Sequence, residues 1–229
     1  MLQVRDLGVA YGHARVIHDL NLSLNPGEMV FIVGRNGAGK TTLLKTIAGL
    51  LKPISGTITF KDQSIVSQSP EKLARMGFRF VAQDKKVFSE LSVRSNVELA
   101  AYGAGEPMDK AWNKVTQLYP KIEEFRDMPA GNLSGGQREI LLIGRALVGD
   151  PTVLLIDEPT EGLAAIVIQD IFRILNSMRN AVSAIIVEQN LSIVKRLADR
   201  IYVMKEGNLI CEIADKAQIA DSTQLEAYL

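Results

Sequence analysis

The sequence predicts an α/β fold whose sheet is mostly parallel, with an antiparallel β part near the N-terminus and a helical insertion. One observation is a set of short apolar segments with the length of buried strands: Met29–Val33, Phe78–Ala82, Val153–Ile156 and Ser183–Val187. A second is the helical spacing of apolar residues between these segments, as in the crossovers that join parallel strands. A third is the region 84–135, in which the strand pattern is absent and a helical pattern remains.

The N-terminal part predicts two antiparallel strands followed by the first parallel strand. Apolar and polar residues alternate over Leu2–Ala10 and again over residues 20–24, and each stretch is followed by a turn that contains Gly or Pro. A glycine-rich loop comes after the first apolar segment. A helix is then predicted over Thr41–Leu51, ending near Pro53.

The remaining elements predict one domain, residues 1–229, made of two interleaved parts. Residues 1–83 and 136–229 are expected to form the α/β core, and residues 84–135 a helical subdomain with one helix opened by Ser92. The later elements follow in order: helices over Ile140–Val148 and Ala165–Met178, a hairpin over Tyr202–Ile213 and a terminal helix.

Composition limits the classes of partner and the compartment. Lys and Arg number 26, as do Asp and Glu, so no overall field attracts the chain to nucleic acid, and no nucleic-acid partner is expected. The apolar runs are far shorter than the 18 or so residues that span a bilayer. The first residues include Arg5 and Asp6, which a secretory signal would exclude, so a cytoplasmic location is expected.

The loop after Met29–Val33 has the sequence of a phosphate-binding loop, between a strand and a helix. Its glycines allow backbone N–H groups to surround phosphate oxygens at the positive end of a helix dipole. Lys40 is expected to reach the β- and γ-phosphates, and the Thr41 hydroxyl to hold Mg²⁺. This predicts a P-loop NTPase with a RecA-like core, whose nucleotide-binding residues are Gly34, Arg35, Asn36, Gly37, Ala38, Gly39, Lys40, Thr41 and Thr42.

Two carboxylates follow the apolar segment Val153–Ile156, where ligands bind at the carboxyl ends of parallel strands. Asp157 is expected to bind Mg²⁺ directly or through water. Glu158 is the candidate base for the attacking water. Alone, such a strand end is a weak signal, but together with the phosphate-binding loop it predicts hydrolysis of a nucleoside triphosphate.

A third motif, Leu133-Ser134-Gly135-Gly136-Gln137, stands at the head of a helix and has no use in kinases or small GTPases. The three motifs, in this order and spacing, resemble the ATP-binding subunit of an ABC transporter over essentially the whole chain. The resemblance implies that two such subunits pair head to tail and that Ser134, Gly135, Gly136 and Gln137 of one complete the ATP site of the other. An exposed helix N-terminus with a serine is a second anion site, which agrees with this arrangement.

The resemblance also implies roles for single residues. Tyr11 occupies the position of an aromatic residue that stacks on adenine. Gln83 matches a glutamine that touches Mg²⁺ and links to the membrane partner. Gln189 stands where most members of the family have a histidine that holds the γ-phosphate. Because an amide cannot carry a positive charge or relay a proton, slower catalysis is expected.

The same resemblance implies a peripheral position on the inner face of the cell membrane, through transmembrane permease subunits and, indirectly, a solute-binding protein. The runs Glu188-Gln189-Asn190 and Thr160-Glu161-Gly162-Leu163 resemble subunits of importers for branched-chain amino acids, urea and short amides. The resemblance favours an importer of branched-chain amino acids. The alternatives are an importer of urea or short amides, a soluble ABC ATPase, and a nucleotide-binding regulator that does not hydrolyse ATP. The intact Glu158 argues against the last of these.

Overall fold

The computed structural model describes residues 1–66, 68–221 and 226, and the strands in them form two sheets. The smaller sheet is antiparallel, with the strand order β2-β1-β4-β5. Its strands are β1 (Leu2–Tyr11), β2 (Ala14–Leu24), β4 (Ser55–Phe60) and β5 (Gln63–Ser64). The predicted antiparallel pairing of the first two strands is confirmed.

The larger sheet has the strand order β10-β9-β3-β8-β7-β6, and five of its strands are parallel. Its strands are β3 (Met29–Val33), β6 (Phe78–Val81), β7 (Val153–Asp157), β8 (Ser183–Val187), β9 (Arg200–Lys205) and β10 (Asn208–Ile213). All five residues of β3, β7 and β8 are buried, because the sheet is covered on both faces. The expected mostly parallel sheet is confirmed.

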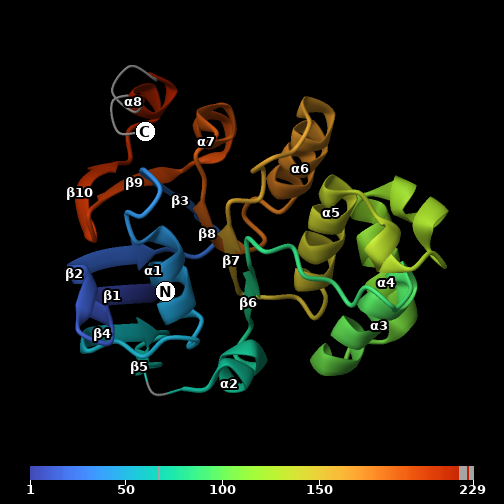
Figure 1. The fold of residues 1–229 in the computed structure, drawn as a ribbon, viewed down its shortest axis with the longest axis horizontal. Helices are drawn as coiled ribbons and strands as arrows, with labels where there is room; N and C mark the ends of the chain where they lie inside the picture. The colour runs from blue at the N-terminus through green and yellow to red at the C-terminus, as the bar shows by residue number, and fades with distance from the viewer. Residues whose placement is uncertain (67, 222–225, 227–229) are drawn as a thin grey trace.

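Helices cover the larger sheet and form a lobe of their own (Figure 1). Their bounds are α1 (Lys40–Ile47), α2 (Pro70–Arg75), α3 (Val93–Ala104), α4 (Met108–Leu118), α5 (Gly135–Ala146), α6 (Ala165–Ser177), α7 (Leu191–Leu197) and α8 (Lys216–Ala220). Helix α1 packs with the smaller sheet against one face of the larger sheet, while α5, α6 and α7 pack against the other. None of the helices in the described part of the chain has the length and apolar character to cross a bilayer.

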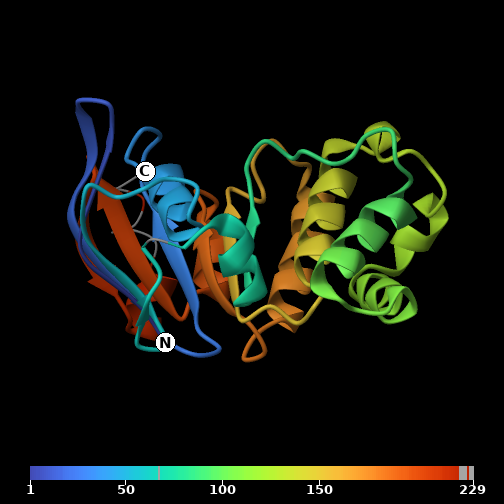
Figure 2. The ribbon, with the colours of Figure 1, turned by 90° about the horizontal axis from the view of Figure 1, so that it is seen from below.

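The region 84–135 folds as predicted into a helical lobe, which Figure 2 shows at the far side of α5 from the two sheets. Ser92 caps α3, and its hydroxyl accepts a hydrogen bond from Ser95 N at 3.0 Å. A small core of buried apolar residues joins α3, α4 and α5. Helix α5 takes part in two cores, since Leu141 faces this lobe and Ile140 faces the larger sheet.

Several boundaries differ from the expectation. Helix α1 ends at Ile47 rather than Leu51, because Gly49 takes a left-handed conformation (φ 74°) that closes the helix. Helix α5 begins at Gly135, five residues before the apolar pattern starts. Strands β4 and β5 and helices α2 and α7 were not predicted from the sequence, nor were the short 3₁₀ helices Pro120–Phe125 and Ala130–Asn132. The expected terminal helix appears as α8, and the residues beyond 221 lie outside the described part except for residue 226.

Candidate functional site

The phosphate-binding loop connects β3 with α1. It lies in close contact with the β9–β10 hairpin. Gly34 has a φ of 150°, and a Cβ on it would overlap the carbonyl of Met204 in β9, so a side chain is excluded here. The Ala38 carbonyl accepts a hydrogen bond from Gly207 N at 2.9 Å. A cleft of about 430 Å³ follows this loop and is lined by residues 36–42 together with Val16, Gln83 and Glu158.

Lys40 lies at the centre of the loop and is only 5% exposed. Its ammonium group donates hydrogen bonds to the Gly34 carbonyl at 2.6 Å and the Arg35 carbonyl at 3.1 Å. It also lies 3.4 Å from Oε1 of Glu158. A phosphate bound by the loop would meet this ammonium group directly.

Asp157 is the last residue of β7 and is buried beside Glu158. Among the described residues, no group donates a hydrogen bond to either oxygen of its carboxylate. Burial raises the pKa of Asp157 above its usual value. A buried carboxylate without a partner is costly, and a hard cation with oxygen ligands would remove that cost. Asp157, with the Thr41 hydroxyl at the start of α1, therefore fits Mg²⁺.

The described residues hold no cluster of three or more His, Cys, Asp or Glu side chains that could bind a metal. Mg²⁺ is commonly held by one or two protein ligands plus phosphate oxygens and water, and Thr41 and Asp157 would be those two ligands. The amide nitrogen of Gln83 donates to Glu158 Oε2 at 3.2 Å and to Glu161 Oε2 at 2.7 Å. A role of Gln83 as a metal ligand stays a prediction.

Glu158 projects into the cleft with an unusual backbone. Its φ is 49°, in the left-handed region that a non-glycine residue rarely adopts, and it is 5% exposed. Its Oε1 accepts a hydrogen bond from Gln189 Nε2 at 2.8 Å. Its carboxylate is thus held by two amide side chains, Gln83 and Gln189, beside the ammonium group of Lys40.

Gln189 connects Glu158 with the phosphate-binding loop. Besides its bond to Glu158, its amide nitrogen donates to Asn36 Oδ1 at 2.7 Å. Both amide hydrogens are used in these two bonds. The structure therefore brings Gln189 to the same cleft as Lys40 and Glu158.

Tyr11 lies close to the start of α1, with its hydroxyl 3.5 Å from Oγ1 of Thr42. Its ring is about half exposed, at 49%. An exposed aromatic face beside the phosphate-binding loop is available for stacking, and the stacking role stays a prediction.

The third motif forms the N-terminus of α5 with a complete capping box. Ser134 Oγ accepts from Gln137 N at 3.2 Å, and Gln137 Oε1 accepts from Ser134 N at 2.8 Å. Ser134 is exposed to solvent. Lys40 begins α1 and Ser134 caps α5, and these two helices pack against opposite faces of the larger sheet.

The sequence did not lead us to predict a role for one buried carboxylate of the site, that of Glu188. Glu188 follows β8 directly and is 2% exposed. The signal was present, because an acidic residue directly after an apolar strand is the pattern that singled out Asp157.

Fold and site together define a P-loop ATPase. Residues 17–161 match the model of the ABC transporter family. The chain is 35% identical over 231 residues to the high-affinity branched-chain amino acid transport ATP-binding protein BraG of Pseudomonas aeruginosa (strain PAO1), covering 100% of this chain and 99% of the relative. It is 31% identical over 234 residues to the lipopolysaccharide export system ATP-binding protein LptB of Escherichia coli (strain K12), covering 100% of this chain and 96% of the relative.

A solved structure agrees with these relatives. The crystal structure of a nucleotide-free ATP-binding cassette from an ABC transporter superposes with a TM-score of 0.87 at 28% identity, covering 100% of this chain and 98% of that one. The chain belongs to the ABC transporter family. It is an ATP-binding cassette of that family, an enzyme that hydrolyses ATP.

Proposed function

We propose that this chain powers an importer of branched-chain amino acids as its cytoplasmic, peripheral ATPase subunit. The observation that carries the catalytic part is the position of Glu158 between Lys40, Gln83 and Gln189 in the phosphate cleft. The full-length similarity to BraG supports the choice of solute. The similarity to LptB, which is lower, makes an export role the second candidate.

The roles of the residues follow from their chemistry. Backbone N–H groups of the loop and Lys40 bind the phosphates, which replace the Gly34 and Arg35 carbonyls as partners of the ammonium group. Thr41 and Asp157 would hold Mg²⁺, which neutralises charge on the phosphates when it is bound. Glu158 accepts the proton of the attacking water, and Gln189 would donate to the γ-phosphate one of the two amide hydrogens that it gives to Asn36 and Glu158 in this structure.

The complete site needs a second copy or a close relative of this chain. The helix N-terminus at Ser134 is a ready anion site, and α5 packs against the opposite face of the larger sheet from α1, which begins with Lys40. Two chains in head-to-tail arrangement would place each Ser134 against the γ-phosphate bound by the partner. The oligomer would then be a closed dimer with two composite sites.

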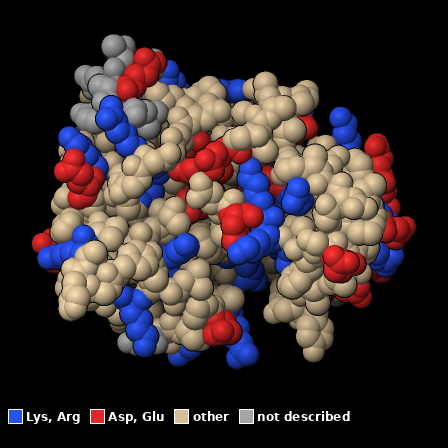
Figure 3. Space-filling view, viewed as in Figure 1, with Lys and Arg blue, Asp and Glu red and all other residues tan. Residues whose placement is uncertain are grey.

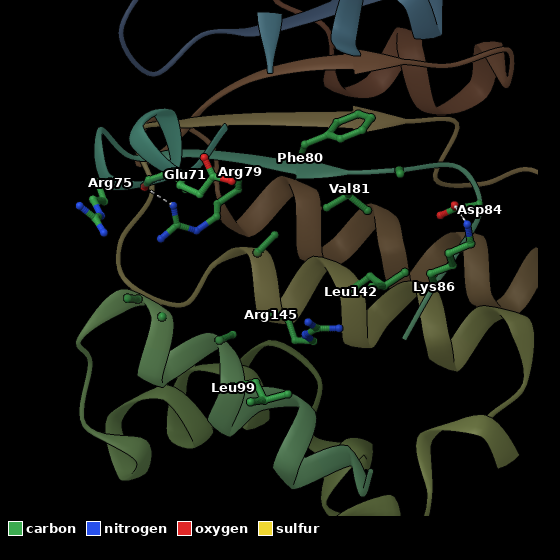
Figure 4. Close-up of a pocket in the computed structure, with 16 residues that line it drawn as sticks. Glu71, Arg75, Arg79, Phe80, Val81, Asp84, Lys86, Leu99, Leu142 and Arg145 are labelled. Carbon is green, nitrogen blue, oxygen red and sulfur yellow. Dashed lines mark hydrogen bonds and ion pairs between the residues drawn. The ribbon is translucent and has the colours of Figure 1, made fainter. Parts of the chain in front are cut away.

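A cleft between the two lobes is the proposed docking site for the permease. It measures about 650 Å³ and lies between α2, β6, α3 and α5, where Figure 3 shows a notch in the outline of the molecule. Its floor is apolar, with Val81, Leu99 and Leu142, and Figure 4 shows charged side chains around it. The charged lining residues are Glu71, Arg75, Arg79, Asp84, Lys86 and Arg145.

This cleft suits a short amphipathic helix of a permease. Asp84 is at its rim, one residue from Gln83, which contacts Glu158. Movement of the docked helix would therefore shift Gln83 and, through it, the carboxylate of Glu158. A solute-binding protein would deliver the solute to the permease and not to this chain.

Uptake measurements in a strain that lacks this chain test the proposal. Loss of leucine, isoleucine and valine uptake, restored by the wild-type chain but not by Glu158→Gln, is the expected result. Loss of urea or acetamide uptake instead would support an importer of urea or short amides. Unchanged uptake of all these solutes would contradict an import role and direct attention to export.

A further inference from the structure

Glu188 forms the most complete set of hydrogen bonds of any buried carboxylate near the site. Its Oε1 accepts from both the backbone N–H of Thr160, at 3.1 Å, and the Thr160 hydroxyl. Its Oε2 accepts from the backbone N–H groups of Gln189, at 2.6 Å, and Asn190, at 2.8 Å. A carboxylate has about four acceptor positions, so all of them are used.

The two bonds from Thr160 join two loops that carry the catalytic groups, and the other two bonds lie within the loop of Glu188 itself. Thr160 lies two residues after Glu158, in the loop that follows β7. Glu188, Gln189 and Asn190 make up the loop between β8 and α7. Strands β7 and β8 are neighbours, with Asp157 paired to Val187, so the two loops start side by side. The carboxylate of Glu188 fills the space between them.

The loop after β7 is also fixed from its other side. Lys85 donates to the Glu161 carbonyl at 2.7 Å, and Gln83 donates to the Glu161 carboxylate. Glu188 adds a second link between this loop and the loop after β8, besides the direct bond from Gln189 to Glu158. The contact between Gln189 and Glu158, at 2.8 Å, depends on where both loops are held.

Packing alone does not account for a carboxylate here. Among the ion pairs of the described residues, none includes Glu188, so its charge is balanced by neutral donors. Burial of a charge in this way is costly unless several hydrogen bonds compensate. An apolar side chain would fill the volume but would leave the four donors without an acceptor and would remove the link from Thr160 to the loop after β8.

We propose that Glu188 is a positioning residue for ATP hydrolysis, which sets the distance and angle between Glu158 and Gln189 by locking their two loops together. The proposal rests on the roles given above to Glu158 and Gln189. In this role Glu188 acts through the two loops, and not by contact with ATP or with the attacking water.

The first test is Glu188→Gln, measured as turnover number and KM for ATP separately, together with ADP affinity. The amide of glutamine has one acceptor oxygen and one donor nitrogen. Its oxygen can still accept hydrogen bonds on one side, but its NH₂ group then faces backbone N–H donors on the other side and cannot bond to them. The turnover number is expected to fall about tenfold or more, since small displacements of catalytic groups are costly. ADP affinity and KM are expected to stay within about twofold, because the phosphate loop and Tyr11 are untouched.

Glu106→Gln is the matched control. The Glu106 side chain is also buried, at 4% exposed, and it also accepts a backbone N–H, that of Gly149 at 2.8 Å, but in the helical lobe. Its variant is expected to lower the melting temperature and to keep the turnover number of the wild type. An equal loss of turnover in Glu106→Gln and Glu188→Gln, or turnover of Glu188→Gln within twofold of wild type, would overturn the proposal.

A milder variant covers the case in which Glu188→Gln does not fold. Thr160→Val removes only the hydroxyl donor to Glu188, whereas Thr160→Ser keeps it. Turnover is expected to fall in the valine variant and to be retained in the serine variant, and equal rates in the two would contradict the proposal. Glu158→Gln separates the catalytic proposal from the positioning proposal. If Glu158→Gln keeps turnover, the proposed catalytic site is wrong. If Glu158→Gln loses turnover but the Glu188→Gln and Thr160→Val variants keep it, only the positioning role of Glu188 is wrong.

Discussion

Lys40 and Glu158 form an ion pair inside the phosphate cleft, with Nζ and Oε1 3.4 Å apart and side chains only 5% and 7% exposed. In the proposed mechanism, Lys40 also binds phosphate and Glu158 also accepts a proton from the attacking water. Phosphate in the loop would compete with Glu158 for the ammonium group of Lys40. The candidate base would then be released toward the attacking water when the triphosphate binds.

Glu158→Gln is expected to abolish steady-state hydrolysis while ATP binding survives and the closed dimer accumulates. Loss of a general base costs on the order of 10²–10⁴-fold in rate. Phosphate release and ATP binding, measured on the same preparation, check both halves. Glu28→Gln, which removes another partly buried ion pair, that with Arg200 at 2.8 Å, is the control and should keep the rate. Turnover of Glu158→Gln within a few-fold of wild type would show that this carboxylate is not the base.

Gln189→Ala is expected to lower turnover and to leave ADP affinity nearly unchanged, because ADP lacks the γ-phosphate. The variant also frees Asn36 and Glu158 from their shared amide donor. Gln189→His should be tolerated, since an imidazole can donate to the same phosphate oxygen. Calorimetric binding of ADP beside ATP turnover decides the matter, and an equal loss of ADP and ATP affinity would make Gln189 a structural residue.

Local motifs made the phosphate loop, Asp157 and the capped start of α5 predictable, because each is set by residues close in sequence. The link between Glu188 and Thr160 was not, since it exists only because β7 and β8 are adjacent in the sheet. The same holds for Lys85 and Glu161, which are brought together from different loops. Sheet order and loop positions follow from packing of the whole chain, which a single sequence does not reveal.

The short elements were missed for a different reason. Strand β5 has two residues and α2 has six, so neither gives a full period of apolar residues. Helix α2 did carry a start signal, as Ser69 caps it and Pro70 is its first residue. A cap without an apolar pattern was too weak a signal to predict a helix.

Glu139 predicts a dependence of stability on pH. It is buried on α5, and within the described part of the chain neither of its carboxylate oxygens has a hydrogen-bond partner. Burial raises its pKa to about 8, with Lys85 lowering and Glu188 raising the value. Because the pKa is higher in the folded than in the unfolded chain, the protonated form stabilises the fold fully below the unfolded value of 4.5. That stabilisation is lost progressively as pH rises to about 8.

Glu139→Gln removes this proton and should flatten the profile. Its melting temperature is expected to match that of the wild type near pH 5 and to exceed it at pH 8. At pH 8 the free energy of unfolding of the variant should be larger by on the order of a few kcal/mol. Thermal unfolding of both chains at several pH values measures the difference. A difference that stays constant with pH would show that Glu139 is ionised in the folded chain.

Leu99→Glu should weaken association with the permease without loss of basal ATPase activity. Leu99 is 42% exposed and lines the cleft between the lobes, where a charge would disturb the apolar floor. Ile54→Glu is the control, because Ile54 is 60% exposed but is absent from that cleft. Co-purification with the membrane subunits compares the two variants, and equal recovery in both would place the docking surface elsewhere.

The proposed head-to-tail dimer, in which Lys40 and Ser134 of one chain belong to different composite sites, predicts that two inactive variants restore one another. Lys40→Met should lose phosphate binding. Ser134→Asp should keep the helix cap, since Asp is a good N-cap, but it sets a negative charge against the partner's γ-phosphate. A mixed dimer of the two variants has one site with both mutations and one site with neither.

Neither variant alone should hydrolyse ATP, and an equal mixture should recover about a quarter of the wild-type rate, because half of the dimers are mixed and each has one intact site. The rate per chain of the wild type should also rise with protein concentration, as expected when activity requires association. ATPase assays over a dilution series and over a range of mixing ratios measure both effects. A mixture that stays inactive, or a wild-type rate that is independent of concentration in a strict monomer, would contradict the shared site.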